Sequence, residues 1–302
     1  MTSADNEIRE NMMTINDNQL LEIQKVCLNL LKVFDSFCEE NKLLYYVCGG
    51  GCIGAVRHHG FIPWDDDIDV MMPRNDYEKL KVLWPQQIDE AKYRFNDNTE
   101  SQFLRTMWAS ISDENTTFIK GRQKDLDISH GIKLEIIPLD GCPSNKMQRK
   151  IQMFWALIHQ IYINQEPPIS KGSFLKGIGN ILLRLHGNWK SRYRAAIQAE
   201  KRMSKFPFSQ CEKVTELTTR FQYMRNEYPK EAFNDAIRIP FEDFMMPVPI
   251  GYDCYLKMAF GNYMELPPES ERMPKHDAVY IDTHSSYKNF KGKYYCVESS
   301  RS

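Results

Sequence analysis

Four aspartates stand within five positions of the chain: Asp65, Asp66, Asp67 and Asp69. The run 67–72 alternates polar and apolar residues and predicts a β-strand, in which alternate side chains point to one face. Asp67 and Asp69 would then project together, while Ile68 turns into the core. Two carboxylates held together repel each other unless a cation lies between them. Oxygen ligands in such a pair suit a hard divalent ion, so the pattern predicts a Mg²⁺ or Mn²⁺ site.

An acidic run is more often a solvated loop than a metal site. This run, however, lies between the apolar stretches 61–64 and 70–72, which favours the metal site. An EF-hand loop that starts at Asp65 does not fit, because its sixth position requires glycine and its twelfth requires glutamate, where Val70 and Asp76 stand. The DxD motif of a sugar-nucleotide glycosyltransferase also holds a metal on a diphosphate and stays an alternative.

Three consecutive glycines, Gly49, Gly50 and Gly51, follow an apolar segment at 43–48 that predicts a buried strand. A glycine turn before a short helix exposes main-chain N–H groups that can bind a phosphate. A glycine pair alone is weak evidence, since it more often marks a tight turn. A strand, a glycine turn, a short helix and a DxD motif on the next strand form a more specific pattern. This order is the architecture of the nucleotidyltransferase (polymerase β-like) superfamily.

The elements that would position these residues alternate between helix and strand in the first half of the chain. Apolar spacing predicts helices at 17–40 and 75–84, and strands at 43–48, 67–72 and 131–140. Further helices are expected at 144–164, 173–187 and 189–205, before an irregular, proline-rich end at 240–268. We therefore expect an α+β fold in one compact unit. A nucleotidyltransferase-like core with a small mixed sheet would span 17–140, and a mainly helical and irregular acceptor-side extension would span 141–302.

The composition argues against several classes of protein. A net charge of −1 is unlike that of proteins that bind nucleic acid through a strongly basic face. No apolar run approaches the roughly 20 residues that span a bilayer, and the polar start MTSADNEIRENMM does not resemble a signal peptide. The eight cysteines contain no CxxC pair, so we expect reduced thiols in the cytoplasm and no zinc site.

The stretch around the acids closely resembles the signature of the LicD family, whose relatives include fukutin and fukutin-related protein. The family pattern GG-T-LLGA-[IV]-R-x-x-GFIPWDDD-[IV]-D is matched here by GGGCIGAVRHHGFIPWDDDID at 49–69. The resemblance continues through RNDYEKL at 74–80, GIKLEIIPLDGCP at 131–143 and LKMAFGNYMELPPESERMPKH at 256–276. It therefore covers roughly residues 20–280, and the 49–74 block is its specific part.

The resemblance implies a metal-dependent transferase on a nucleotidyltransferase fold. Such enzymes move a phosphorylated small alcohol, typically phosphocholine, from a CDP-activated donor to a hydroxyl of a cell-surface glycan, and CMP leaves. Asp67 and Asp69 would hold Mg²⁺ or Mn²⁺ on the donor diphosphate. A third carboxylate is expected on a neighbouring strand, and Glu135 is placed to share the metal or to take the acceptor's proton. Most relatives have aspartate there, and the alternative is a strand residue facing solvent.

The same resemblance implies further donor contacts. Gly49, Gly50, Gly51 and Arg57 would bind the phosphates, although Arg57 could instead be a surface residue at a helix end. Five residues would contact the substrates: Trp64, Asp65, Asp66, Arg272 and His276. Trp64 could contact a quaternary ammonium or could pack the loop, and the sequence favours neither role over the other. Arg272 and His276 could also be ordinary loop residues.

A basic segment suggests where the acceptor binds. No acidic residue occurs from 167 to 199, and the span 171–194 interleaves lysines and arginines with apolar residues. This pattern fits an interfacial helix on anionic lipid, and hence peripheral contact at the inner face of the membrane with a lipid-linked glycan acceptor. A core helix with a basic outer face gives the same interleaved pattern and is equally common.

Three functions remain open at this level. The first is a transferase that uses a CDP-activated alcohol, whose alcohol could be choline, ethanolamine, a polyol or an aminoethyl phosphonate. The second is a DxD glycosyltransferase that uses a sugar nucleotide. The third is a non-catalytic glycan-binding protein with a decayed site, against which the intact Gly49, Gly50, Asp67 and Asp69 speak.

Overall fold

A mixed β-sheet forms the centre of the protein. The computed structural model describes residues 15–166, 172–274 and 277–297. Five strands follow one another across the sheet: β1 (Tyr46–Cys48), β2 (Asp69–Pro73), β6 (Ile132–Cys142), β4 (Ala109–Asp113) and β3 (Tyr93–Asn96). β2 and β6 are parallel, whereas β1 with β2, β6 with β4 and β4 with β3 are antiparallel. The predicted mixed sheet is confirmed.

The longest strand, β6, joins the two halves of the chain. Its residues before 137 pair with β4, and from Leu139 onward the same edge pairs with β7 (Lys213–Glu216). β7 in turn pairs with the short β8 (Tyr228–Pro229). The second half of the chain therefore adds strands to the central sheet and is richer in β-structure than predicted.

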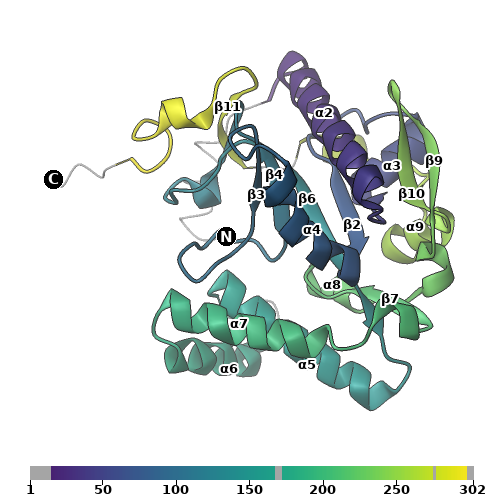
Figure 1. Ribbon diagram of the computed structural model, residues 1–302, viewed down its shortest axis with the longest axis vertical. Coiled ribbons are helices and arrows are strands. Elements are labelled where there is room, and N and C mark those ends of the chain that lie inside the picture. Colours follow the sequence, from purple (N-terminus) through teal and green to yellow (C-terminus); the bar gives the residue numbers. More distant parts are fainter. Residues whose placement is uncertain (1–14, 167–171, 275–276, 298–302) are drawn as a thin grey trace.

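Two helices cover one face of the sheet, as Figure 1 shows. α2 (Asp17–Asn41) packs on β6 and β4, and α4 (Arg74–Gln87) packs on β2, β3 and β6. α2 begins with a capping box between Asn16 and Gln19, which satisfies two main-chain donors at its start. Its apolar stripe is fully buried at Ile23, Leu31 and Phe34, as the helical spacing predicts.

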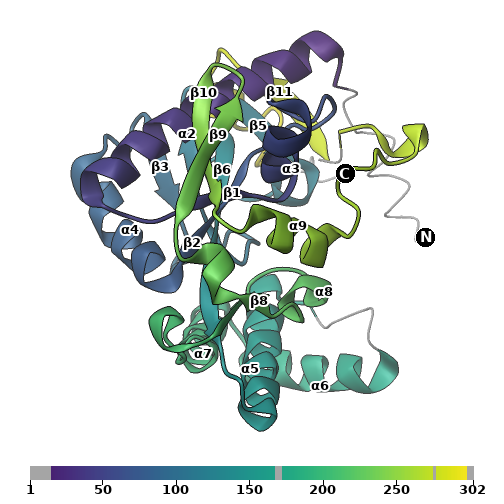
Figure 2. The same cartoon turned by 90° about the vertical axis from the view of Figure 1, so that its right-hand side faces the viewer.

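Three further helices gather at one end of the molecule in Figures 1 and 2: α5 (Lys146–Asn164), α6 (Gly172–Leu185) and α7 (Trp189–Met203). All three agree with the predicted ranges to within two residues. A buried ion pair ties this end to the sheet. The guanidinium of Arg74 at the start of α4 donates to both oxygens of Asp140 on β6 and to Glu200 on α7, each at 2.8 Å.

The prediction of an irregular end at 240–268 is wrong for residues 240–260 and holds for 261–268. β9 (Ala236–Phe241) and β10 (Phe244–Pro249) form a hairpin, followed by α9 (Tyr252–Phe260). Pro247 and Pro249 do not disrupt the hairpin, because β10 pairs with β9 alone and its other edge needs no ladder donors. α9 contacts α3 (Gly49–His58), the predicted short helix, which begins with the three glycines instead of following them.

The C-terminal segment returns to the first half of the chain. β11 (Ala278–Asp282) pairs with β5 (Thr117–Lys120), and the short 3₁₀ helix Tyr287–Phe290 follows. Among the described residues, none of the helices combines the length and the apolar character that crossing a bilayer requires.

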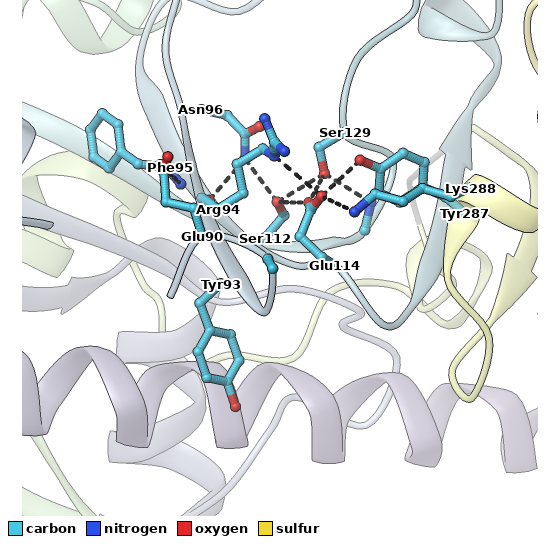
Figure 3. Close-up of polar contacts among 12 residues, drawn as sticks. Glu90, Tyr93, Arg94, Phe95, Asn96, Ser112, Glu114, Ser129, Tyr287 and Lys288 are labelled. Atoms are coloured by element: carbon cyan, nitrogen blue, oxygen red, sulfur yellow. Dashed lines mark hydrogen bonds and ion pairs between the residues drawn. The ribbon is translucent and has the colours of Figure 1, made fainter. Parts of the chain in front are cut away.

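A buried carboxylate, Glu114, holds this returning segment in place, as Figure 3 shows. Its Oε1 accepts hydrogen bonds from Ser112 and Ser129, and its Oε2 accepts one from the hydroxyl of Tyr287 at 2.7 Å. Arg94 and Lys288 add positive charge at 3.2 and 3.4 Å. Burial alone would raise the pKa of Glu114, but the three hydrogen bonds and Arg94 outweigh it, so the pKa is lowered.

Replacing Glu114 with glutamine tests this contact. Because the folded pKa is lowered, the ionised carboxylate stabilises the fold above its unfolded pKa of about 4.3, and this contribution is lost as the pH falls through the folded pKa. We expect Glu114→Gln to lower the free energy of unfolding in urea by about 1–3 kcal/mol at pH 7 and by less below pH 4. The exposed Glu212→Gln serves as control. Equal stability of Glu114→Gln and the wild type at pH 7 would contradict this role.

Candidate active site

The register of three strands places the predicted acids beside the glycine turn. Cys48 at the end of β1 pairs with Asp69 on β2, and Asp69 pairs with Glu135 on β6. Residues directly opposite each other in a sheet share a face. Gly49 directly follows Cys48, so the turn, Asp69 and Glu135 form one row. β2 starts at Asp69, two residues later than predicted, and Asp67 lies in the segment just before it.

One cavity of about 700 Å³ contains this row. Five of the predicted site residues line it: Gly49, Gly50, Asp67, Asp69 and Glu135. The two carboxylates of the DxD motif therefore face the same space, next to the glycine turn. The volume lies within the range that suits a small-molecule ligand, about 300–1,000 Å³.

The carboxylates in this cavity are electrostatically strained. Burial raises the pKa of Asp69 well above its usual value, and the charges of Asp67 and Glu135 raise it further, while Lys120 opposes the shift. The Oδ1 atom of Asp69 is buried and has no hydrogen-bond partner. A buried oxygen that accepts no proton donor and faces two other carboxylates is suited to bind a divalent cation. The acids at this cavity therefore fit the predicted metal, although among the described residues the three carboxylates whose oxygens converge within 4.8 Å of one another are those of Asp65, Asp66 and Asp67.

Glu135 is held in place from two sides. Trp108 donates its indole N–H to Oε2 at 2.7 Å, and the ammonium of Lys120 lies 3.2 Å from Oε1. Burial tends to lower the pKa of Lys120, but the charge of Glu135 outweighs it and the pKa is raised. Glu135 is thus partly buried and oriented toward the cavity, and it is not a solvent-facing strand residue.

Sequence reasoning missed both partners of Glu135. Lys120 is the charged last residue of the otherwise uncharged, buried strand TFIK, a pattern that could have pointed to a functional lysine. Nothing in the sequence around Trp108 marks it, because its contact with Glu135 depends on the pairing of β4 with β6.

The glycines have distinct roles. Gly49 has a φ of +55°, which side chains rarely tolerate, and its N–H donates to the hydroxyl of Tyr255 at 3.1 Å. A Cβ at Gly50 would overlap the carboxylate of Asp65, so the turn and the acidic run approach each other closely. Gly51 does not line the cavity; it is buried, and a Cβ there would lie 2.7 Å from Val47. Gly51 therefore serves packing.

Several predicted residues lie in a neighbouring pocket of about 600 Å³, which shares Gly50 and Phe260 with the main cavity. Arg57, Trp64 and Asp65 line it. The guanidinium of Arg57 donates to the carbonyls of Tyr263 and Glu265 at 2.7 and 3.1 Å, so the structure gives it a role in fixing that loop.

The remaining predicted residues are dispersed. The guanidinium of Arg272 lies 5.8 Å from the ring centre of Trp64 and donates to the carbonyl of Pro267. Asp66 is buried and lines a small hollow with Asp67, Lys120 and Glu135. His276 lies outside the described residues. The predicted set is thus divided between the main cavity and its surroundings.

Four basic residues line the same cavity as the acids: Arg105, Lys120, Arg122 and Arg220. Arg105 is paired with Asp125 and Lys120 with Glu135. Arg122 and Arg220 form no ion pair among the described residues. Their charges are available for an anionic ligand, and the spacing of these residues in the sequence gave no sign of it.

Comparison with known proteins agrees with this geometry. Residues 42–128 match the family model described as LicD/FKTN/FKRP, nucleotidyltransferase domain. The chain is 32% identical over 267 residues to the lipopolysaccharide cholinephosphotransferase LicD of Haemophilus influenzae, which covers 85% of this chain and 96% of that protein.

Shorter matches occur to two uncharacterised proteins, one from Rickettsia prowazekii and one from Rickettsia typhi. The first is 32% identical over 80 residues and the second 33% over 69 residues, which covers 30% and 22% of those proteins and 24% and 23% of this chain. The long match to a characterised relative decides the assignment: this chain belongs to the LicD family.

Proposed function

We propose that this protein transfers phosphocholine from CDP-choline to a hydroxyl of a lipopolysaccharide-type glycan and releases CMP. The observation that carries the proposal is the register of β1, β2 and β6, which puts a glycine turn and three carboxylates around one cavity. The relative from Haemophilus influenzae, 96% of which aligns with this chain, is named a lipopolysaccharide cholinephosphotransferase. The arrangement also supports the nucleotidyltransferase-type core that the family model's description names.

In this proposal Asp67, Asp69 and Glu135 hold Mg²⁺ or Mn²⁺. When bound, the metal would neutralise charge on the donor diphosphate. Trp108 and Lys120 fix the orientation of Glu135, which suits a ligand better than a mobile base. The N-terminus of α3, which begins at Gly49, and Gly50 bind the donor's phosphates at the cavity, and Arg122 and Arg220 supply further positive charge.

The reaction itself is a single displacement at phosphorus. The acceptor's hydroxyl oxygen forms a bond to the phosphorus that carries choline, the bond from that phosphorus to the oxygen of CMP breaks, and the hydroxyl proton leaves to solvent or a neighbouring carboxylate. The protein contributes positioning and charge neutralisation, and no covalent group on the chain is required.

The proposed membrane contact through 171–194 rests on α6. Ile181 and Leu185 are exposed on this helix, at 60% and 71%, and Arg184 lies beside them. On α7, by contrast, Lys190 and Arg194 both pair with Glu100, at 3.2 and 2.7 Å, which offsets two of the positive charges. The side chains of residues 171–176 lie outside the described part.

The metal is tested by Asp69→Asn. Because the folded pKa of Asp69 is raised, ionising it costs the metal-free protein stability as the pH rises from the unfolded toward the folded pKa. The variant should therefore unfold at the same temperature as the metal-free wild type or a higher one. At a fixed Mn²⁺ concentration a hundredfold above the Kd at neutral pH, the wild type should gain about 2.7 kcal/mol, and it should gain more at pH 8 than at pH 5, whereas the variant should gain nothing.

Thermal unfolding with and without Mn²⁺ measures both effects. Asp243→Asn, an exposed aspartate paired with Lys32, is the matched control and should respond to Mn²⁺ like the wild type. A full Mn²⁺ response in Asp69→Asn would place the metal elsewhere.

The transfer is tested by Asp67→Asn. With CDP-choline, Mg²⁺ and lipopolysaccharide, the wild type should release CMP and add one phosphocholine to the glycan, as mass spectrometry would show. The variant should lose at least about a hundredfold in kcat/KM, because metal-based charge stabilisation is worth several kcal/mol. Release of UDP from a UDP-sugar, with none of CMP from CDP-choline, would reject this function in favour of a glycosyltransferase.

A further inference from the structure

Aromatic rings form a wall of the cavity that the metal and phosphate roles do not use. They come from two helices, α8 (Phe221–Met224) and α9, and Figure 2 shows α9 between α3 and α8. Tyr223, Tyr255 and Phe260 line the cavity. The ring centres of Tyr223 and Phe260 are 5.9 Å apart, and those of Tyr255 and Phe260 are 6.2 Å apart. The rings of Tyr223 and Tyr255 thus both contact that of Phe260, and the three form one aromatic cluster at this wall.

A buried carboxylate lies at the same wall. Glu216 at the end of β7 is 4% exposed, lines the cavity and accepts a hydrogen bond from the hydroxyl of Tyr228 at 2.6 Å. Burial raises its pKa to about 7, and within the described chain no lysine or arginine forms an ion pair with it. A carboxylate that faces a cavity without a cationic partner is suited to a cationic ligand.

This wall adjoins the glycine turn. The hydroxyl of Tyr255 accepts the N–H of Gly49, so one ring touches the turn itself. Cys48, directly before the turn, pairs with Asp69 and lines the same cavity as Glu216. A group joined to a phosphate by a two-carbon arm could thus reach the aromatic wall while its phosphate lies at the turn.

We propose that Tyr223, Tyr255, Phe260 and Glu216 form the subsite for the trimethylammonium group of the donor, an inference that rests on the proposed function. A quaternary ammonium has no N–H to donate, so it is recognised by aromatic faces and by a nearby negative charge. The wall offers both, and it stands beside the phosphate position. Trp64, for which the sequence left this role and packing of the loop equally open, lies in the neighbouring pocket with Arg272 against its ring.

The competing occupant is the cytosine ring, which could also stack on these side chains. Charge separates the two, because choline is cationic and cytosine is neutral. The probes are therefore phosphocholine, its uncharged isostere 3,3-dimethylbutyl phosphate, and CMP. Calorimetry in the presence of Mg²⁺ measures binding of each, independently of whether transfer occurs.

The wild type should bind phosphocholine at least about tenfold more tightly than the isostere, because only the charged ligand gains from the carboxylate of Glu216 as well as from the aromatic faces. Glu216→Gln should remove most of this preference and leave the affinity for CMP within about twofold. Phe260→Ala, at a ring that is 38% exposed, should weaken phosphocholine binding while keeping the fold intact, which thermal unfolding checks. The exposed Glu231→Gln and Phe154→Ala are matched controls and should bind all three probes like the wild type.

Two results would overturn the subsite. One is a wild type that binds phosphocholine and the isostere equally. The other is a loss of CMP affinity in Glu216→Gln or Phe260→Ala as large as the loss for phosphocholine, which would assign the wall to the nucleobase. A protein that shows the phosphocholine preference without releasing CMP from CDP-choline would instead refute the proposed transfer and leave the subsite standing.

Discussion

The mutual repulsion of buried carboxylates is the constraint on which the rest of this site depends. Hydrogen bonding of the sheet fixes Asp69 opposite Glu135, and the chain before β2 brings Asp67 to the same cavity. Folding alone does not relieve the resulting charge, because burial and the neighbouring acids both raise the pKa of Asp69. The repulsion among these carboxylates therefore persists in the folded protein, and a divalent cation bound between them would reduce it.

Residues around the acids reduce this repulsion and fix the position of Glu135. Lys120 and Trp108 hold Glu135, and Lys120 belongs to β5, whose partner β11 comes from the C-terminal segment. Asp277, directly before β11, accepts main-chain hydrogen bonds from Gly121 and Arg122 at 2.7 and 3.1 Å. The Glu114 network thus supports the site from a distance, because it anchors the segment that orders the strand bearing Lys120.

Local patterns were enough to predict the elements that carry the DxD motif. Helical spacing located α2 and α4, and the glycines located the start of α3. Residues whose role depends on strand pairing were missed: Trp108, Lys120, Arg122 and Glu216 come from segments far from the motif. Arg57 and Trp64 lie next to the motif in the sequence, yet α3 and its following loop turn them into the neighbouring pocket. Proximity in sequence thus predicted that the acids and the glycines share one cavity, but not which basic and aromatic residues line it with them.

A crystal structure with Mn²⁺ and CDP-choline tests the central claim most directly, because the anomalous signal of manganese locates the ion without assumption about its ligands. The account predicts a peak about 2.2 Å from carboxylate oxygens of Asp67 and Asp69, with the diphosphate against the main chain of Gly49 and Gly50. An ion bound by Asp65 and Asp66 away from Asp69, or a diphosphate held by Arg57 in the neighbouring pocket, would contradict it.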